Sequence, residues 1–277
     1  MNNKPRVTII GKGKVGQSIA QLLLRSAYEI TVFDRDIDEQ LDFLAQAELV
    51  LLTVNDDDIE GLCEKLSRHF AKGSTIAHCS GSLGSDVLSS AKQNGCFIAS
   101  AHPLNTFPNL PSSLQTFAST KHGTFLYSEG DAQALELLQP VFQSIGFNTV
   151  VLESAAKPAY HAACVFACNY LTVLMDLSLQ SAEAASLDRD KFWRAIQPLL
   201  ASTLHNINVH GTVHALSGPI ARGDVQTVTS HLASLSKTEN NLDQAYTLLG
   251  KHALRLAAQG GEIDSDKYAA LVEILNR

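Results

Sequence analysis

The sequence has little of what would place it in an oxidising compartment or on a nucleic acid. Its 277 residues include five cysteines, and the chain carries a net charge of −7. The cysteines form no CxxC pair and no regular framework, which argues against a disulfide scaffold. Without a basic excess, a phosphate backbone is not expected as a partner. The start, MNNKPRVTII, shows no hydrophobic targeting region. We therefore expect a cytoplasmic protein that binds no nucleic acid.

A metal site and a membrane span are not expected either. The spacing of His205, His210 and His214 fits no standard metal site, and no carboxylate lies near them in the sequence. The run 159–179 is long and apolar, but it contains polar residues such as Asp176. Such residues are rare in membrane spans, so we expect this run to be a buried core helix.

The first half of the chain alternates short apolar runs with helical patterns. Apolar residues make up 45% of the sequence, and the length suits about two domains of ~100–200 residues each. Apolar runs without alternation indicate strands buried on both faces, and hence a parallel, doubly wound sheet. The expected strands are 6–10, 30–34, 49–54, 74–78, 96–101, 123–127 and 148–152. The expected helices between them are 15–25, 57–70 and 132–144.

From about residue 154 the pattern is helical throughout. We expect a nearly continuous helix over 159–185 and a second helix capped by Asp188 and kinked at Pro198. Asp224 is expected to cap a third helix, Gly260-Gly261 to close a fourth, and 266–275 to form the last. The sequence therefore predicts an α/β fold class with two domains, an N-terminal Rossmann domain (1–153) and a C-terminal all-α domain (154–277).

The first predicted strand leads into a glycine-rich turn, Gly11-Lys12-Gly13-Lys14-Val15-Gly16. In a GxGxxG turn the first glycine allows the tight turn, the second lets the backbone approach a pyrophosphate, and the third lets helix and strand pack closely. The helix N-terminus then faces the phosphates. Because the motif follows a strand and opens a helix, we expect NAD or NADP to bind here.

Asp34 and Arg35 follow the second predicted strand and indicate different cofactors. An acid at this position normally binds the ribose 2′-OH of NAD, whereas an arginine can hold the 2′-phosphate of NADP. We favour NADP, because Asp34 can turn away while Arg35 has few other roles. The alternative for Arg35 is a solvated surface charge. After the next strand, Val54 and Asn55 are expected beside the cofactor, and Asp56 is expected to cap the following helix.

Two further strand ends carry polar side chains. Ser80 lies in the stretch HCSGS, and His102 and Asn105 lie in HPLNTF. The carboxyl ends of successive strands line the ligand crevice of open α/β sheets, so we expect these three residues to bind substrate. His78 is interpreted as a hydrogen-bonded core histidine.

These motifs occur in an order that resembles a known family. The stretches GKGKVG, TVNDD, HCSGS, HPLNTF, KPAYHAA, NYL and GPIARGD follow one another along the chain. The chain resembles the uncharacterised Rossmann-like family with a C-terminal domain of unknown function, in the 6-phosphogluconate dehydrogenase-like superfamily. That superfamily includes β-hydroxyacid dehydrogenases, ketopantoate reductase and pyrroline-5-carboxylate reductase. The resemblance implies a 6-phosphogluconate dehydrogenase-like helical domain and a homodimer formed through it.

The resemblance also implies a catalytic lysine. Many relatives have a lysine at the start of the long interdomain helix and an asparagine four residues later. Lys157 matches the lysine, and His161 stands where the asparagine would be. The stretch 103–106 differs in chemistry from the Pro-Val-Ser-Gly stretch that holds a substrate carboxylate in β-hydroxyacid enzymes. Residues four apart on a helix are neighbours, so Lys157 and His161 can converge on one ligand.

The expected function is that of an NAD(P)-dependent oxidoreductase acting on a small carbonyl/alcohol or imine/amine substrate held between the domains. Lys157 is expected to act as the general acid, since burial and the positive helix end lower a lysine pKa. His161 is expected to orient the substrate or relay the proton. Arg222 is expected either to bind an anionic substrate group or to belong to an ordinary loop. The alternative function is a non-catalytic NAD(P)-binding redox sensor.

Overall fold

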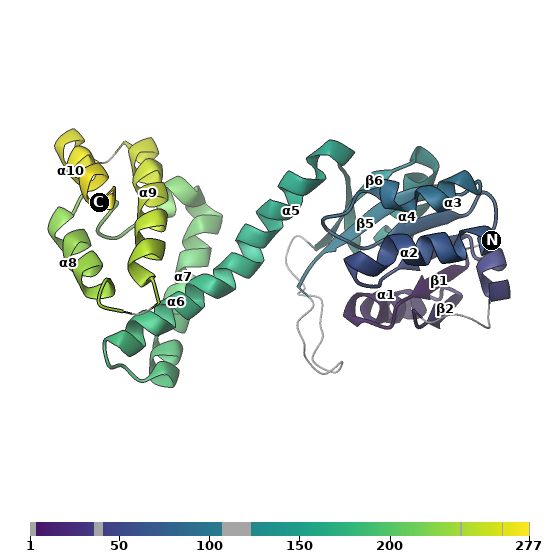
Figure 1. Cartoon of the computed structure of the whole chain (residues 1–277), viewed down its shortest axis with the longest axis horizontal. Helices are drawn as coiled ribbons and strands as arrows, with labels where there is room; N and C mark the ends of the chain where they lie inside the picture. Colours follow the sequence, from purple (N-terminus) through teal and green to yellow (C-terminus); the bar gives the residue numbers. More distant parts are fainter. Residues whose placement is uncertain (1–3, 36–40, 107–122, 239, 262, 277) are drawn as a thin grey trace. The chain divides into compact units, whose positions relative to one another are not determined.

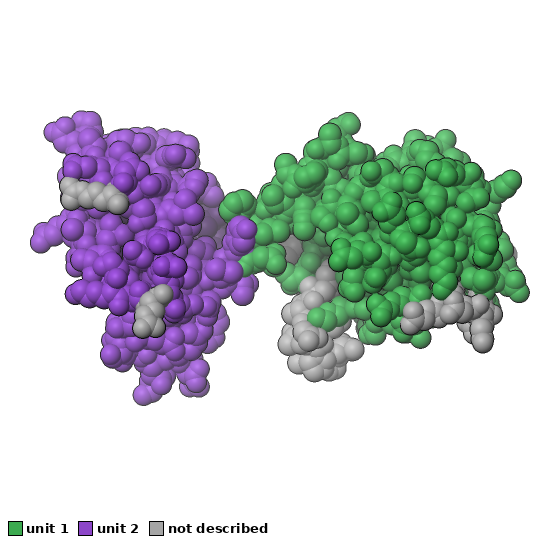
Figure 2. All heavy atoms as spheres, in the orientation of Figure 1, with its two compact units in different colours: residues 1–169 green, residues 170–277 purple. Residues whose placement is uncertain are grey.

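The computed structural model describes residues 4–35, 41–106, 123–238, 240–261 and 263–276 (Figure 1). The chain divides into two compact units, Met1–Asn169 and Tyr170–Arg277 (Figure 2). The predicted boundary near residue 153 marks the change from strand to helix, whereas the division into units falls after Asn169. Each unit is described by itself below.

The first unit is built on a seven-stranded sheet, which is drawn in purple to teal on the right of Figure 1. The strand order is β2-β1-β3-β4-β5-β6-β7. Because the order reverses between β1 and β3, a ligand crevice is expected at the carboxyl ends of these two strands. The strands are β1 (Val7–Ile10), β2 (Ile30–Phe33), β3 (Leu49–Leu52), β4 (Thr75–His78), β5 (Phe97–Leu104), β6 (Thr124–Gly130) and β7 (Phe147–Val151).

All seven predicted strands are present, but the sheet is mixed rather than wholly parallel. The first five strands are parallel to one another, whereas β6 pairs antiparallel with β5, and β7 pairs parallel with β6. A parallel neighbour requires a crossover, usually a helix, while an antiparallel neighbour does not. The sequence shows no helical pattern between β5 and β6, which is consistent with their antiparallel pairing.

Helices cover both faces of this sheet. Helices α1 (Lys14–Arg25) and α4 (Ala132–Ser144) pack on one face, and α2 (Asp56–Leu66) and α3 (Ser89–Gln93) pack on the other. Successive residues of β3 alternate between the two cores, and all four are fully buried. Burial of both faces explains why these strands read as continuous apolar runs.

The predicted long helix is present but is not a core helix. It consists of α5 (Lys157–Val165), a π-helical turn (Phe166–Tyr170) and α6 (Leu171–Ala184). Within this stretch only Lys157 and Ala182 are buried. The span 154–184 is long and apolar enough to cross a membrane by length and composition, with 0% of its most apolar window buried. The prediction of a buried core helix is therefore wrong for the single chain. An apolar composition indicates that a helix packs against another surface, but it does not show whether that surface belongs to the same chain.

The second unit continues with helices α7 (Arg189–Ala215), α8 (Val225–Leu235), α9 (Leu242–Gly260) and α10 (Ser265–Leu275). Asp188 and Asp224 cap α7 and α8 by accepting hydrogen bonds from backbone N–H groups, as predicted. Gly261 closes α9 in the left-handed conformation. A break in α7 that was not predicted lies at Gly211, with φ 74°, and Pro198 lies inside the helix, where its kink stays a prediction. A small core joins α8, α9 and α10.

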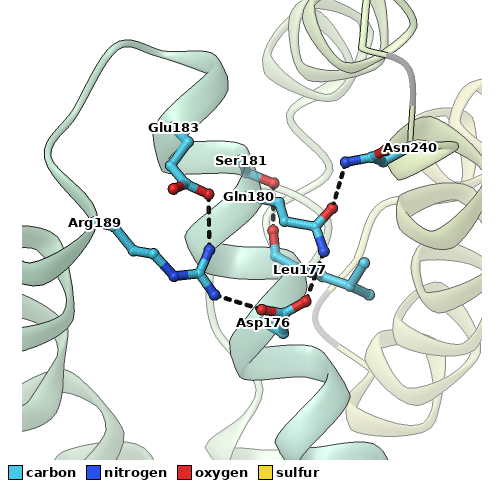
Figure 3. Close-up of polar contacts among 7 residues, drawn as sticks. All are labelled: Asp176, Leu177, Gln180, Ser181, Glu183, Arg189 and Asn240. Carbon is cyan, nitrogen blue, oxygen red and sulfur yellow. Dashed lines mark hydrogen bonds and ion pairs between the residues drawn. The ribbon is translucent and has the colours of Figure 1, made fainter.

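Polar contacts join the end of α6 to the start of α7 (Figure 3). Arg189 bridges Asp176 at 2.5 Å and Glu183 at 2.7 Å. The side-chain amide of Gln180 donates to Asp176 and accepts from Asn240, which precedes α9. Since the ion-paired side chains are 41–52% exposed, water screens each pair and it contributes little to stability. The network therefore sets the conformation of the turn between α6 and α7 but adds little to the stability of the unit.

Candidate functional site

The glycine turn joins β1 to α1 in close contact with the end of β3. Gly11 has φ +117°, and a Cβ there would lie 2.7 Å from the backbone of Thr53. A Cβ on Gly16 would collide with the carbonyl oxygen of Gly11 and the hydroxyl of Thr53. That hydroxyl donates a 2.9 Å hydrogen bond to the Gly11 carbonyl. Gly11 and Gly16 are therefore required for the turn itself and for the packing of helix on strand.

Gly13 has a different role in this turn. It is the N-cap residue of α1, with an ordinary φ of −67°, and no side chain caps the helix. A Cβ on Gly13 would come no closer than 3.7 Å to another atom, the carbonyl oxygen of Thr53. The fold therefore does not require glycine at this position. The first turn of α1, starting at Lys14 and Val15, contains no acid and leaves its N–H groups for an anion.

Asp34 and Arg35 follow β2 and are both turned toward protein groups. The Asp34 carboxylate accepts the backbone N–H of Arg35 at 2.8 Å. The Arg35 guanidinium lies 3.4 Å from the carboxylate of Asp58, and both side chains are exposed. An exposed pair of this kind is weak, so it does not prevent Arg35 from binding a phosphate. Asp36, the next residue along the chain, lies outside the described residues.

The stretch after β3 links two strand ends. Asn55 is the N-cap residue of α2, and the helix begins at Asp56. The prediction that Asp56 caps this helix is wrong, because its carboxylate accepts the hydroxyls of Ser80 and Ser82 at 2.8 and 2.7 Å. Asp56 thus ties the loop after β4 to the end of β3, next to Val54. Ser80 is buried, and its hydroxyl is already held by this carboxylate.

Rings from β5 and α5 form a cluster beside this loop. His102 Nδ1 lies 2.8 Å from the hydroxyl of Tyr160, and the rings of His102 and His161 meet edge to face at 6.2 Å. A Cβ on Gly81 would lie 2.9 Å from His102 and 3.1 Å from His161, so the glycine leaves room for both rings. Burial, together with the charges of Lys157 and His161, lowers the pKa of His102 to about 4. His102 is therefore neutral at pH 7.

Lys157 is the first residue of α5 and is buried at 2% exposure. Its ammonium donates a hydrogen bond to the hydroxyl of Ser100 in β5. Burial lowers the pKa of Lys157, while Glu129, Cys79 and Asp56 oppose that shift. A lysine whose pKa is lowered holds its proton less tightly than a lysine in water.

The structure brings some of the predicted residues together and leaves others apart. Lys157, His161 and His102 share one neighbourhood. Asn105 lies past the end of β5 in a local turn, where its side chain accepts the N–H of Thr106. The neighbouring Phe107 lies outside the described residues.

Arg222 belongs to the second unit. Its backbone N–H donates to the carbonyl of Gly218, in the loop before α8. The roles predicted for Asn105 and Arg222, and the placement of substrate between the domains, stay predictions. Among the described residues no group of three or more potential metal ligands is present.

Sequence reasoning missed four residues of this region. The hydroxyl of Thr53 donates to the glycine turn, and the hydroxyl of Ser100 accepts from Lys157. Tyr160 forms a hydrogen bond with His102, and Glu129 is a buried carboxylate. Tyr160 had a detectable signal, because it lies one turn from Lys157 and next to His161. Ser100 and Glu129 had none, since their proximity depends on strand register.

Comparison with domain families identifies both parts of the chain. Residues 30–103 match the Rossmann-like domain family, and residues 124–253 match DUF2520, a domain of unknown function. The chain therefore contains a Rossmann-like domain followed by a DUF2520 domain, which confirms the predicted family and fold class. A comparison with curated proteins gave no match.

Solved structures share this fold over nearly the whole chain. A Thermotoga maritima protein is 24% identical, with a TM-score of 0.69, and the match covers 91% of this chain and 98% of that one. An imine reductase from Myxococcus stipitatus in complex with NADP+ is 17% identical, with a TM-score of 0.63 and coverage of 99% and 100%. A reductive aminase from Aspergillus terreus in complex with NADPH and ethyl-5-oxohexanoate is 12% identical, with a TM-score of 0.64 and coverage of 98% and 100%. At these identities the likeness establishes the fold.

Proposed function

We propose that this protein is an NAD(P)-dependent oxidoreductase that acts on a small carbonyl/alcohol or imine/amine substrate. The observation that carries the proposal is the glycine turn, in which Gly11 and Gly16 are fixed by packing while Gly13 leaves an open approach to an uncapped helix N-terminus. Such a turn suits a pyrophosphate. The structural neighbours crystallised with NADP+ or NADPH support the same cofactor class.

The residues around the turn fit a dinucleotide. The N–H groups at the start of α1 would hold the pyrophosphate, and Lys12 and Lys14 add positive charge beside it. Asp34 and Arg35 lie at the end of β2, where the adenosine ribose is bound in folds of this kind. We favour NADP, because the Asp34 carboxylate is already occupied by a backbone N–H while the Arg35 guanidinium is held only by an exposed pair.

When bound, the cofactor supplies a hydride from its nicotinamide ring. Lys157 then acts as general acid, donating its ammonium proton to the oxygen or nitrogen on which charge develops. Burial lowers the pKa of this lysine, which makes it a better donor near neutral pH. The hydroxyl of Ser100 holds the ammonium in place before transfer.

Side chains beside the lysine orient the substrate. His102 is uncharged at pH 7 and is fixed by Tyr160, so it offers a ring nitrogen without competing for the lysine proton. His161 packs against His102 and follows Lys157 by one turn, which places it to orient the substrate or relay a proton. Ser80 and Asn105 complete the proposed substrate residues, and Arg222 would hold an anionic group.

We also propose that the protein is a homodimer formed through its helical domain. The structure describes all residues of α7, and none of them is buried. Even its apolar side chains Leu199, Leu204 and Val209 are 55–65% exposed. Apolar surface of this extent marks an interaction site. A second copy presenting the same helices would bury it, whereas the charged and polar residues of α6 and α7 suit a protein partner better than lipid.

The lysine is tested by replacing Lys157 with Met, which preserves volume in a buried position. We expect turnover of the best substrate among aldehydes, ketoacids and imines to fall ~10²–10⁴-fold, with NADPH affinity unchanged within about twofold. The control is Lys92→Met, which removes a lysine paired with Asp131 at the surface. A wild type that binds NADPH but turns over nothing, with an indistinguishable mutant, would favour the redox sensor over the enzyme.

A further inference from the structure

A buried row of polar residues crosses three neighbouring strands below Lys157. His78 of β4 is the register partner of Ser100 in β5, and Ser100 is the register partner of Glu129 in β6. Register partners place their side chains on the same face of a sheet. The three residues are 0%, 0% and 1% exposed. A buried carboxylate in such a row requires an explanation, because burying an unpaired charge is costly.

The buried carboxylate of Glu129 accepts hydrogen bonds from two serines. Its carboxylate accepts the backbone N–H of Ser85 at 2.6 Å and the hydroxyl of the same serine at 2.9 Å. The hydroxyl of Ser154 donates to it at 2.6 Å. All three of these groups donate to the carboxylate, which suits a carboxylate because it accepts hydrogen bonds and donates none. Ser154 begins the short 3-10 turn Ser154–Ala156, which leads directly into Lys157. Glu129 therefore fastens the base of α5 to the sheet.

Lys157 contacts Ser100, the register partner of Glu129. The ammonium donates to the hydroxyl of Ser100, the middle member of the row. A buried ammonium is stable only when an opposite charge compensates it. Glu129 is the first of the acidic groups that act on Lys157, and Asp56 is already engaged by two serine hydroxyls. The buried cation thus contacts Ser100, whose hydroxyl donates to the carbonyl of Ser80, and the buried anion Glu129 is the register neighbour of Ser100 in the next strand.

We propose that Glu129 is the positioning residue of the site: it anchors the first turn of α5 through Ser154 and supplies the buried negative charge that keeps Lys157 protonated until substrate arrives. The catalytic consequence rests on the proposed function, whereas the electrostatic one does not. No sequence motif contains Glu129, and its role follows only from the pairing of β5 with β6.

The pH consequence depends on every titratable group around the lysine. These groups are Asp56 at the start of α2, His78 and Cys79 at the end of β4, His102 in β5, Glu129 in β6, and Tyr160 and His161 in α5. Burial lowers the pKa of His78 to about 4 and raises the pKa of Cys79, so both are neutral at pH 7. Glu129 and Asp56 are the acids of the set, and only Glu129 is tied to the base of α5.

The direct test is a titration of Lys157 by NMR with lysine labelled at the ε-carbon, with Lys157→Met identifying its signal. Removing a neighbouring negative charge lowers the pKa of a lysine. In Glu129→Gln, which keeps the shape and one of the two acceptor oxygens, the midpoint should fall by about one pH unit or more. The control Glu136→Gln removes an exposed carboxylate from α4 and should leave it unchanged. An unchanged midpoint in Glu129→Gln overturns the proposal.

Two further variants separate charge from anchoring. Ser154→Ala keeps the carboxylate but removes one anchor, so kcat should fall several-fold while KM and the pH midpoint stay unchanged. Glu129→Asp restores charge and should return the NMR midpoint toward the wild-type value. If neither prediction holds, Glu129 has only a structural role. Because the NMR arm needs neither cofactor nor substrate, its result stands apart from the outcome for the proposed oxidoreductase.

Discussion

At the residue scale, the glycine turn separates positions that the fold requires from one that a ligand requires. Gly16 sits where a single methyl group would strike the Gly11 carbonyl and the Thr53 hydroxyl. Gly13 has free space around its Cα and an ordinary backbone conformation. Packing thus requires glycine at residues 11 and 16, whereas at residue 13 only a ligand would require it, so substitutions at these positions should have different effects.

Gly16→Ala is expected to lower the free energy of unfolding by about 2 kcal/mol or more, because the added methyl group overpacks helix against strand. Gly61→Ala is the matched control, since Gly61 lies within α2 and a methyl group added there would meet no neighbouring atom within 4 Å. That change should raise stability by ~0.5–1 kcal/mol through helix propensity. Urea denaturation of both variants measures the difference, and equal stabilities would contradict the packing of Gly16.

Sequence reasoning reached some site residues because their signal is local. The spacing of the glycines, and the position of Lys157 at a helix start, can be read along the chain. Ser100 and Glu129 could not be found this way, since their approach to Lys157 depends on which strands pair and in what register. Asp56 was assigned to the wrong partner for a similar reason, because the serines it binds come from another strand end.

At the element scale, the strands and most helices follow from apolar pattern and capping residues. Each of the seven predicted strands is present, and α4 has the predicted bounds. The direction of β6 was not predictable in the same way, because direction depends on the connection between strands rather than on the strand itself. The apolar helix over α5 and α6 was correctly located but wrongly assigned to the core of the single chain.

The exposed helices predict the assembly. In sedimentation velocity the wild type should be a dimer, and Val173→Asp in α6 or Leu199→Asp in α7 should raise the dimer dissociation constant ~100-fold or more, since a charge would be buried at the interface. Leu24→Asp is the matched control, because Leu24 is 59% exposed on α1. A monomeric wild type, recovery of the protein with membranes, or equal effects of all three substitutions would contradict a dimer formed through the helical domain.

At the scale of the whole molecule, the chain combines a sheet-based unit that carries the glycine turn, Lys157 and the ring cluster with a helical unit that carries Arg222. The predicted fold class, an α/β part followed by a helical part, is confirmed, whereas the DUF2520 match begins at residue 124 and so includes β6 and β7. The compact division after Asn169 was not predictable from composition, because α5 is helical and yet packs with the sheet through Lys157 and Tyr160.

The most direct test of the account is a fluorescence titration of NADPH and NADH into the wild type and Gly13→Val. A Cβ at residue 13 would meet no atom closer than 3.7 Å, and the two methyl groups that valine adds to it would fill the approach to the start of α1. We predict that the wild type binds NADPH more tightly than NADH, and that Gly13→Val keeps its melting temperature while losing at least tenfold in NADPH affinity, about 1.4 kcal/mol. A tenfold preference for NADH would contradict the assignment of NADP, and equal NADPH binding by both proteins would contradict the cofactor site itself.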